Sequence, residues 1–273
     1  MAVHHDRALL LKRYPFGESS LVVHLGTREH GRVHLMAKGA YRPTSRFFAV
    51  LDFLDTLEIE WDESPRRELG NLRTGSILRR RRSIPEDPGR WFAACSMLEL
   101  SDLAFRPAHP DPRLHDRLET GLEELQGGSH RPDAVLIAFE LSFLDLLGLA
   151  PALQSCASCG GPAPARRDGS RAWFSAGAGG RLCPRCAQEG RASGRRVGTL
   201  PLRTLDDARA LLECGAIAGT DLPQDRVDRV RDFTGRFLDY HLETRPRTHR
   251  AFLSAPNRNG PNRDAARDAA EAS

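Results

Sequence analysis

The stretch CASCGGPAPARRDGSRAWFSAGAGGRLCPRC, residues 156–186, begins and ends with two cysteines that are two residues apart. The pairs are Cys156 with Cys159 and Cys183 with Cys186, and together they hold four of the six cysteines in the chain. A two-residue spacing lets both sulfur atoms reach one ion at the roughly 2.3 Å that tetrahedral zinc prefers. The sequence therefore predicts one zinc ion. Its role would be structural, because four thiolates leave no open position for water.

Two other uses of the cysteines stay open at this stage. A redox motif places Cys-x-x-Cys at a helix N-terminus in a βαβ setting, and neither pair has that setting in the sequence. An iron–sulfur cluster is a second possibility, since such clusters are also held by four cysteines. The remaining cysteines, Cys95 and Cys214, fall in apolar helical patterns, which predicts that both are buried free thiols.

On the N-terminal side of this stretch, the first third of the chain has the pattern of a β-structure. Short runs rich in leucine, valine and aromatic residues are separated by turn-forming segments such as FGESS and TREHG. These runs predict five strands, at residues 7–16, 18–27, 31–39, 50–61 and 69–80. Five short strands fit a small Greek-key barrel, because closure removes exposed sheet edges. We expect one small barrel domain over residues 1–82.

The rest of the chain is predominantly helical in its apolar periodicity. Apolar residues recur at helical spacing over residues 90–105, 112–126, 131–149, 204–214 and 225–242. The third of these segments is apolar on almost every side, which predicts the central helix of a bundle. The fold class is therefore α+β: a five-stranded OB-fold barrel, then a helical domain over residues 88–253 with an inserted zinc-ribbon-like module over residues 154–190. The polar tail, residues 254–273, is predicted to be disordered.

Composition and charge restrict the class of protein. The formal net charge is +4, and residues 1–85 carry 15 Lys and Arg against 10 Asp and Glu, which is a mild electrostatic footprint for a polyanion. No apolar run approaches the roughly 20 residues that span a bilayer, and the N-terminus lacks a convincing signal peptide. We expect a cytoplasmic protein without a membrane partner, in a compartment that keeps thiols reduced.

We find no catalytic motif in the sequence, which predicts a binding protein and not an enzyme. The chain lacks a phosphate-binding Gly-rich loop, a His-Glu-x-x-His pair and a Gly-x-Ser-x-Gly elbow. His24, His30 and His34 lie in the strand region, but no carboxylate or fourth ligand accompanies them. A nuclease or nucleotidyl transferase with an accessory zinc ribbon is the enzymatic alternative, and it requires a carboxylate cluster near the basic surface.

Two basic stretches are candidates for contact with nucleic acid. The first, AKGAYRPTSRFF, places Lys38, Arg42 and Arg46 among Tyr41, Phe47 and Phe48 between the third and fourth predicted strands. Single-strand binding requires cations that contact phosphates and, beside them, aromatic rings that stack on bases. The alternative is that the phenylalanines belong to the barrel core. The second stretch is the run Arg79, Arg80, Arg81 and Arg82, for which a solvated linker is the alternative.

The order of these motifs resembles the RecO family of bacterial recombination mediators over about residues 5–253. AKGAYRPTSRF and the paired cysteine motifs, with two glycines before the second, are the most specific parts of the resemblance. Lys38, Arg42 and Arg46 match the basic loop of the family, and Arg13 lies on the first strand, where a cation can follow the DNA backbone. Many relatives have a Leu-Lys-Ser turn after the last helix, whereas this chain reads ETRPRTHRAFL.

The resemblance implies a function in recombinational DNA repair without catalysis. Proteins of this kind bind single- and double-stranded DNA, anneal complementary strands, and engage RecR and the tail of the single-stranded-DNA-binding protein. They help RecA to load on DNA that is covered by the single-stranded-DNA-binding protein. Two alternatives from the residues alone remain: an RNA- or ribosome-associated protein with an OB barrel and a zinc ribbon, and a thiol-based redox sensor.

Overall fold

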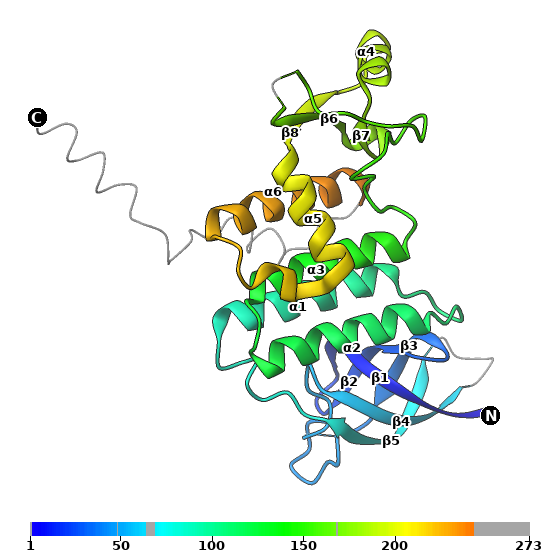
Figure 1. Cartoon of the computed structure of the whole chain (residues 1–273). Helices are drawn as coiled ribbons and strands as arrows, with labels where there is room; N and C mark the ends of the chain where they lie inside the picture. The colour runs from blue at the N-terminus through cyan, green and yellow to red at the C-terminus, as the bar shows by residue number, and fades with distance from the viewer. Residues whose placement is uncertain (1, 48, 64–68, 168, 243–273) are drawn as a thin grey trace, which may run out of the picture.

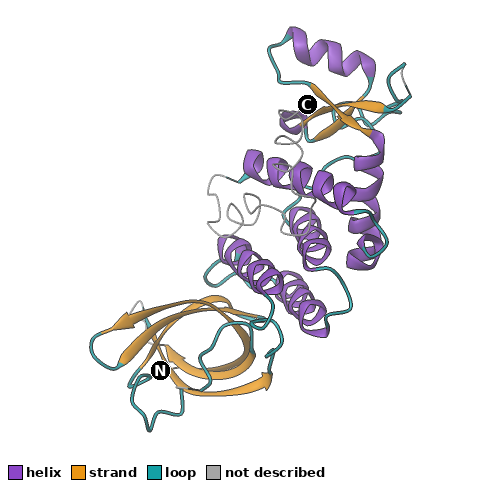
Figure 2. Cartoon of the chain, turned by 90° about the vertical axis from the view of Figure 1, so that its left-hand side faces the viewer, coloured by secondary structure: helices purple, strands orange, loops and turns teal. Residues whose placement is uncertain are grey.

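The structure, a computed structural model, describes residues 2–47, 49–63, 69–167 and 169–242. A strand barrel lies at one end, a group of helices in the middle and a small cysteine-containing module at the other end (Figures 1 and 2). The predicted disordered tail and the aromatic residue Phe48 fall outside the described residues. Within the described ranges, no helix combines the length and the apolar character needed to cross a membrane.

The N-terminal strands close into a barrel in the order β1-β2-β3-β5-β4, with β1 also paired to β4. This is an OB-like arrangement, in which β3 and β5 pair in parallel and the other pairs are antiparallel. Alternate side chains point inward, so that Leu25, Leu35 and Trp61 are fully buried in the barrel. The strands are β1 (Ala2–Phe16), β2 (Ser20–Thr27), β3 (Gly31–Ala37), β4 (Thr56–Glu63) and β5 (Gly70–Arg79).

One predicted strand begins later than the sequence pattern indicated. The run 50–61 is extended only from Thr56, because Leu54 adopts a left-handed backbone with φ of 78° and interrupts the strand. Leu51 is nevertheless buried in the barrel core. It is apolar because the loop before β4 packs on this core, and not because it belongs to a strand.

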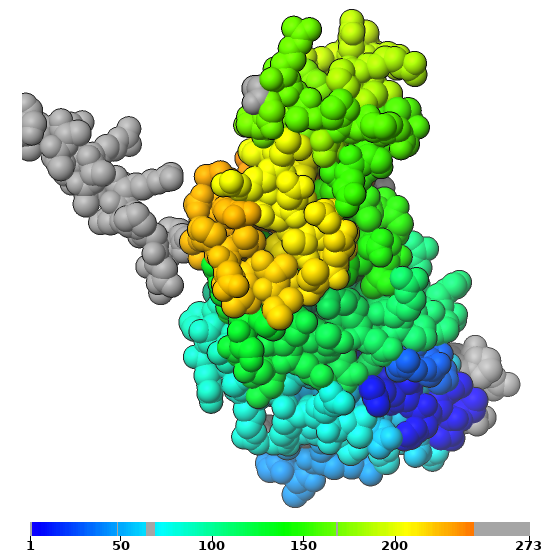
Figure 3. Space-filling view, in the orientation of Figure 1, coloured from blue at the N-terminus to red at the C-terminus, as the bar shows by residue number. Residues whose placement is uncertain are grey.

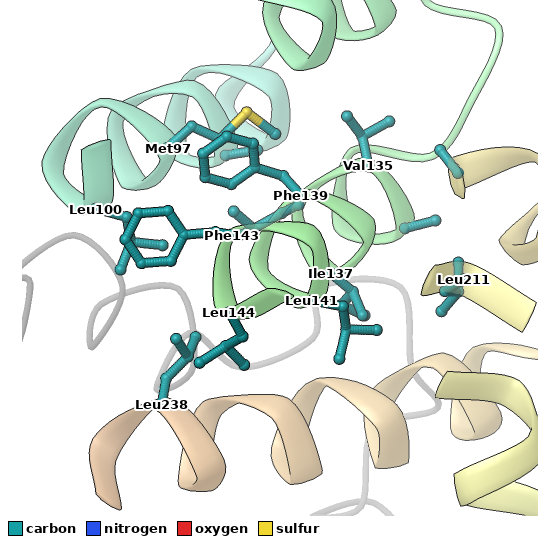
Figure 4. Close-up of a cluster of buried hydrophobic side chains, with 14 of the residues drawn as sticks. Met97, Leu100, Val135, Ile137, Phe139, Leu141, Phe143, Leu144, Leu211 and Leu238 are labelled. Carbon is teal, nitrogen blue, oxygen red and sulfur yellow. The ribbon is translucent and has the colours of Figure 1, made fainter. Parts of the chain in front are cut away.

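The helices pack around α3, which is buried along almost its whole length, as the sequence predicts for a central helix. Phe139 and Phe143 point toward α1, whereas Leu141 and Leu144 point toward α6 (Figure 4). Asp87 and Asp111 cap the first two helices through their carboxylates. The helices of this group are α1 (Pro88–Ala104), α2 (Pro112–Gly127), α3 (Pro132–Leu146), α5 (Leu202–Cys214) and α6 (Gln224–His241), and the short 3₁₀ turn η2 (Gly215–Gly219) follows α5.

The barrel and the helices share one apolar core. Leu9, Leu11 and Leu54 come from the barrel region but belong to the same cluster of buried residues as the helices. Phe105, at the end of α1, lies so close to Gly26 of β2 that a β-carbon there would meet the ring at 2.7 Å. This close approach explains why glycine is needed near the end of β2.

The cysteine module is inserted between α3 and α5 and has a small core of its own around Cys156, Ala163, Leu182 and Cys186. It contains a three-stranded sheet in the order β7-β6-β8, so β8 lies beyond the end at residue 190 that we predicted for the module. The elements are β6 (Arg171–Ser175), η1 (Ala176–Ala178), β7 (Gly180–Leu182), α4 (Pro184–Ala192) and β8 (Gly198–Pro201).

Candidate metal centre and nucleic-acid interface

The four paired cysteines converge on one point of the module. The Sγ atoms of Cys156, Cys159, Cys183 and Cys186 all lie within 4.8 Å of one another. Gly160 follows the first pair with φ of 71°, and its N–H donates to the Cys156 carbonyl at 2.8 Å. This turn folds the chain back around the sulfur atoms, and glycine adopts its left-handed backbone at no steric cost.

The second pair is positioned by the start of α4. The Cys183 sulfur accepts a hydrogen bond from the Cys186 N–H at 3.4 Å and caps the helix. Pro184 occupies the first helical position, where its missing N–H costs nothing. Cys156 and Cys186 are buried, Cys183 is partly buried and Cys159 is exposed, so the centre is closed on one side and reaches solvent at Cys159.

The protonation equilibria of the cluster fit a bound cation. Burial opposes ionisation of Cys156, but hydrogen bonds from the backbone at Cys183, Cys159 and Ser158 bring its pKa down to about 6. The neighbouring Cys183 sulfur, followed by burial, raises the pKa of Cys186 to about 12. Hydrogen bonds thus favour the thiolate of Cys156, whereas the neighbouring sulfur atoms oppose ionisation of Cys186, and a cation bound among the sulfur atoms would favour both thiolates. The donor set can hold a metal ion, and four sulfur ligands in tetrahedral reach are typical of zinc.

The two remaining cysteines lie away from this centre and differ from each other. Cys95 is partly buried, and burial raises its thiol pKa to about 11. Cys214 is exposed at the end of α5. The prediction that both are buried is thus wrong for Cys214, because the helical pattern does not distinguish the last turn of a helix from its interior.

The basic stretch that begins at Lys38 forms the long connection between β3 and β4. Lys38, Arg42 and Arg46 are all exposed, and no described carboxylate lies within ion-pair distance of any of them. The loop is tied to the β1–β2 turn by the Tyr41 N–H, which donates to the Ser19 carbonyl at 2.9 Å. It borders two open hollows of about 380 and 310 Å³, both of which are lined by Lys38 and Arg42.

The aromatic residues beside these cations divide into two groups. Phe47 is 5% exposed in the barrel core, so the core alternative is correct for this residue. Tyr41 is 46% exposed and Phe16 is 55% exposed, and both therefore offer ring surface to solvent. Phe16 lines the larger hollow together with Lys38 and Arg42. The sequence analysis missed Phe16, whose only signal was its position as an aromatic residue at the end of a strand.

The arginine run after β5 separates into inward and outward side chains. The Arg81 side chain is only 1% exposed, and it donates hydrogen bonds to the Leu54 carbonyl and the Thr56 hydroxyl. Arg79 pairs with Glu123 of α2, whereas Arg80 and Arg82 are exposed. The prediction that all four arginines contact nucleic acid, like its solvated-linker alternative, requires exposed side chains, and the buried Arg81 does not meet this requirement. An extended backbone sends alternate side chains to opposite sides, and here one side is the interface with α2.

Two other predicted cations lie at the far end of the basic loop. Arg13 donates to the Leu51 carbonyl at 2.8 Å, and its guanidinium lies 4.9 Å from the centre of the Phe53 ring. Arg80 donates to the Ala49 carbonyl at 3.4 Å. Arg13 and Arg80 thus contact the later part of the connection between β3 and β4, and Lys38, Arg42 and Arg46 lie in its earlier part. All five side chains therefore border one loop of the barrel.

A second group of possible metal ligands, His115, Asp116 and Glu119 on α2, is held by cations of the protein itself. Arg28 binds both Asp116 oxygens, at 2.8 and 2.9 Å, and Arg7 donates to Glu119 at 3.3 Å. Burial lowers the pKa of His115, so this imidazole is neutral near pH 7. These contacts connect the barrel to α2, and they give the group a structural role at the junction.

The comparisons with known protein families cover almost the whole chain. A family model described as Recombination protein O N terminal matches residues 1–81. A second model, Recombination protein O C terminal, matches residues 85–251. The boundary between the two models falls at the arginine run, between the barrel and the first helix. The chain belongs to the RecO family, whose members are mediators of DNA recombination and repair.

Proposed function

We propose that this protein is a non-catalytic recombination mediator that binds single- and double-stranded DNA through the barrel and anneals complementary strands. We further propose that it acts in the cytoplasm with RecR, and that together they help RecA to load on DNA covered by the single-stranded-DNA-binding protein. Family membership supports the general role, and the basic loop supports the way in which DNA is bound.

The observation that carries the proposal is the cluster of unpaired cations on the loop between β3 and β4. Lys38, Arg42 and Arg46 have no carboxylate partner among the described residues, whereas Arg7, Arg28 and Arg81 of the same domain each pair with a carboxylate of α2. Charges that the protein leaves unneutralised in solvent are available to phosphates. The exposed ring of Phe16 lines the larger hollow beside Lys38 and Arg42, and Tyr41 exposes its ring on the same loop, so both rings can stack on bases.

Annealing by such a surface needs no catalytic residue. Two complementary strands repel each other through their phosphates, and a basic surface that binds one backbone lowers this repulsion. Because cations contact phosphates and rings contact only part of each base, the pairing edges stay available to the second strand. The rate of pairing then rises through proximity and reduced repulsion.

We propose that the metal is one structural Zn²⁺ held by Cys156, Cys159, Cys183 and Cys186. Four sulfur ligands fill the tetrahedral sphere, so the ion supplies fold stability and no activated water. Some members of the family lack these cysteines, which fits an ion that supports the fold and takes no part in DNA pairing.

Substituting Arg42→Ala should weaken DNA binding equally for all sequences. Loss of one phosphate contact on a single strand reduces the magnitude of the slope of log K against log salt by about 0.7. At 0.1 M salt this corresponds to an affinity that is about fivefold lower. The measurement is fluorescence anisotropy of a labelled single-stranded oligonucleotide at several salt concentrations. Unchanged affinity and slope in Arg42→Ala would contradict the assignment of this loop.

Arg236→Ala is the matched control for this experiment. Arg236 lies on α6, its side chain is 79% exposed, and its one carboxylate partner among the described residues is Asp232 on the same helix. The control removes the same charge from a site away from the barrel, so it should bind DNA like the wild type. A clear preference for RNA over DNA of the same sequence would favour an RNA-associated function in place of the one proposed.

A further inference from the structure

The cysteine module carries a large positive charge that the total for the chain conceals. Residues 151–201 contain eight arginines but only two acidic residues, Asp168 and Glu189. The rest of the chain beyond residue 85 contains 17 Lys and Arg against 24 Asp and Glu. Four thiolates with one Zn²⁺ would add a charge of −2, which still leaves the module clearly positive. A basic unit is thus joined to an acidic set of helices.

The arginines of the module differ from those of the helices in how they are paired. On α6, Arg226, Arg229 and Arg236 each bind an aspartate. In the module, the described structure pairs Glu189 with Arg185 and gives no carboxylate to Arg166, Arg167, Arg191, Arg195 or Arg196. Of these five, all but Arg166 are exposed. Guanidinium groups of one small module that lack anions of the protein repel one another, and an external polyanion relieves this repulsion.

An aromatic ring contacts two of these arginines. Trp173 on β6 has the Arg166 guanidinium 4.5 Å from its ring centre and the Arg191 guanidinium at 4.3 Å. The Arg191 side chain also donates to the Val197 carbonyl at 3.3 Å, which fixes it beside β8. The ring therefore links the loop before β6 to the end of α4, and it holds two guanidinium planes in defined positions where they can still donate to phosphate oxygens.

We propose that these residues of the module, called the module arginine face (Arg166, Arg167, Trp173, Arg191, Arg195 and Arg196), form a second binding site for the phosphodiester backbone of DNA. The proposal rests on the proposed function, and it extends it by adding a site separate from the barrel loop. Guanidinium groups match phosphate oxygens in geometry and stay charged at all physiological pH values.

The two sites lie at opposite ends of the molecule. In Figures 1 and 3 the module projects at one end, the barrel lies at the other, and the helices separate them. One DNA segment at each end is therefore sterically compatible with a single protein molecule. The module arginine face recruits a second segment, or a later part of the same strand, while the barrel loop binds the first.

The test is a triple substitution, Arg167→Gln with Arg195→Gln and Arg196→Gln, in the full-length zinc-loaded protein. These side chains are exposed and none stacks on Trp173, so the zinc content and the melting curve should match those of the wild type. With a long single-stranded oligonucleotide, removal of three phosphate contacts should reduce the magnitude of the salt slope by about 2. The matched control removes three exposed arginines of the helices, Arg209→Gln with Arg229→Gln and Arg236→Gln, and should leave the slope unchanged.

The outcomes separate this proposal from the proposed function. A wild-type slope in the module variant, together with a reduced slope in Arg42→Ala, would overturn the module site and leave the barrel site in place. An equal reduction in the helix control would also overturn it, because the effect would then follow net charge alone. Absence of salt-dependent binding in the wild-type protein would overturn both proposals.

Discussion

Substituting Cys159→Ser should release the metal and unfold the cysteine module. Apart from its ligands, the module core has few large apolar residues, so little else opposes the entropy of ordering the chain. In small zinc domains, metal binding contributes about 10–16 kcal/mol of apparent free energy at pH 7, and this binding energy is also the folding energy. We expect loss of one metal equivalent per chain and rapid proteolysis within residues 154–201. Metal analysis and limited proteolysis at neutral pH measure these two effects.

The unfolding should be local, and this gives the experiment its control. The cluster around the cysteines is separate from the barrel and helix cores, whereas Ala172 and Phe174 of β6 belong to the helix core. Loss of the metal therefore acts on the cysteine cluster, and the main far-ultraviolet melting transition should persist. Cys214→Ser makes the same chemical change at an exposed cysteine outside the cluster and should behave like the wild type. A metal-free Cys159→Ser protein that resists proteases as the wild type does would contradict the structural role of the metal.

Substituting Arg81→Met should destabilise the protein by about 3 kcal/mol, because removal of one partner from a buried ionic group leaves the other without compensation. Burial lowers the pKa of Arg81 to about 10, and the carboxylates of Glu119 and Asp55 act in the opposite direction and favour the charged form. Methionine fills a similar volume but leaves the Leu54 carbonyl without its donor and Glu119 without one of its cations. Urea denaturation followed by circular dichroism measures the loss.

The neighbouring substitution Arg82→Met is the control for Arg81. Arg82 is exposed, and substitutions at such surface positions usually change stability by no more than about 0.5 kcal/mol. If Arg81→Met kept wild-type stability but weakened DNA binding more than Arg42→Ala does, Arg81 would have to be a DNA contact, and its buried position would be refuted.

Features that depend on local spacing could be predicted from the sequence. The alternation of Leu57, Ile59 and Trp61 predicts an inward face of β4, and all three side chains are buried. The two-residue spacing of the cysteines predicts their convergence, because a tight turn brings such a pair together whatever the rest of the fold does. The central position of α3 follows from a helix that is apolar on every side.

Features that depend on distant packing could not be predicted in the same way. Whether Arg81 faces water depends on α2, which follows it by some 30 residues and covers one side of the extended segment. The late start of β4 depends on the left-handed backbone of Leu54, whose carbonyl is held by Arg81. β8 is only four residues long and is defined by its pairing with β6, so it has no pattern of its own.

The apolar core that the barrel shares with the helices limits how this protein can be divided for experiments. A truncated chain that ended near residue 82, at the boundary between the two family models, would leave Leu9, Leu11 and Leu54 facing water where the helices now cover them. It would also lose the α2 carboxylates that neutralise Arg7, Arg28 and Arg81. Poor solubility of such a fragment would therefore report a missing neighbour and not a defective barrel, and the DNA-binding activity of the barrel is best measured in the intact chain.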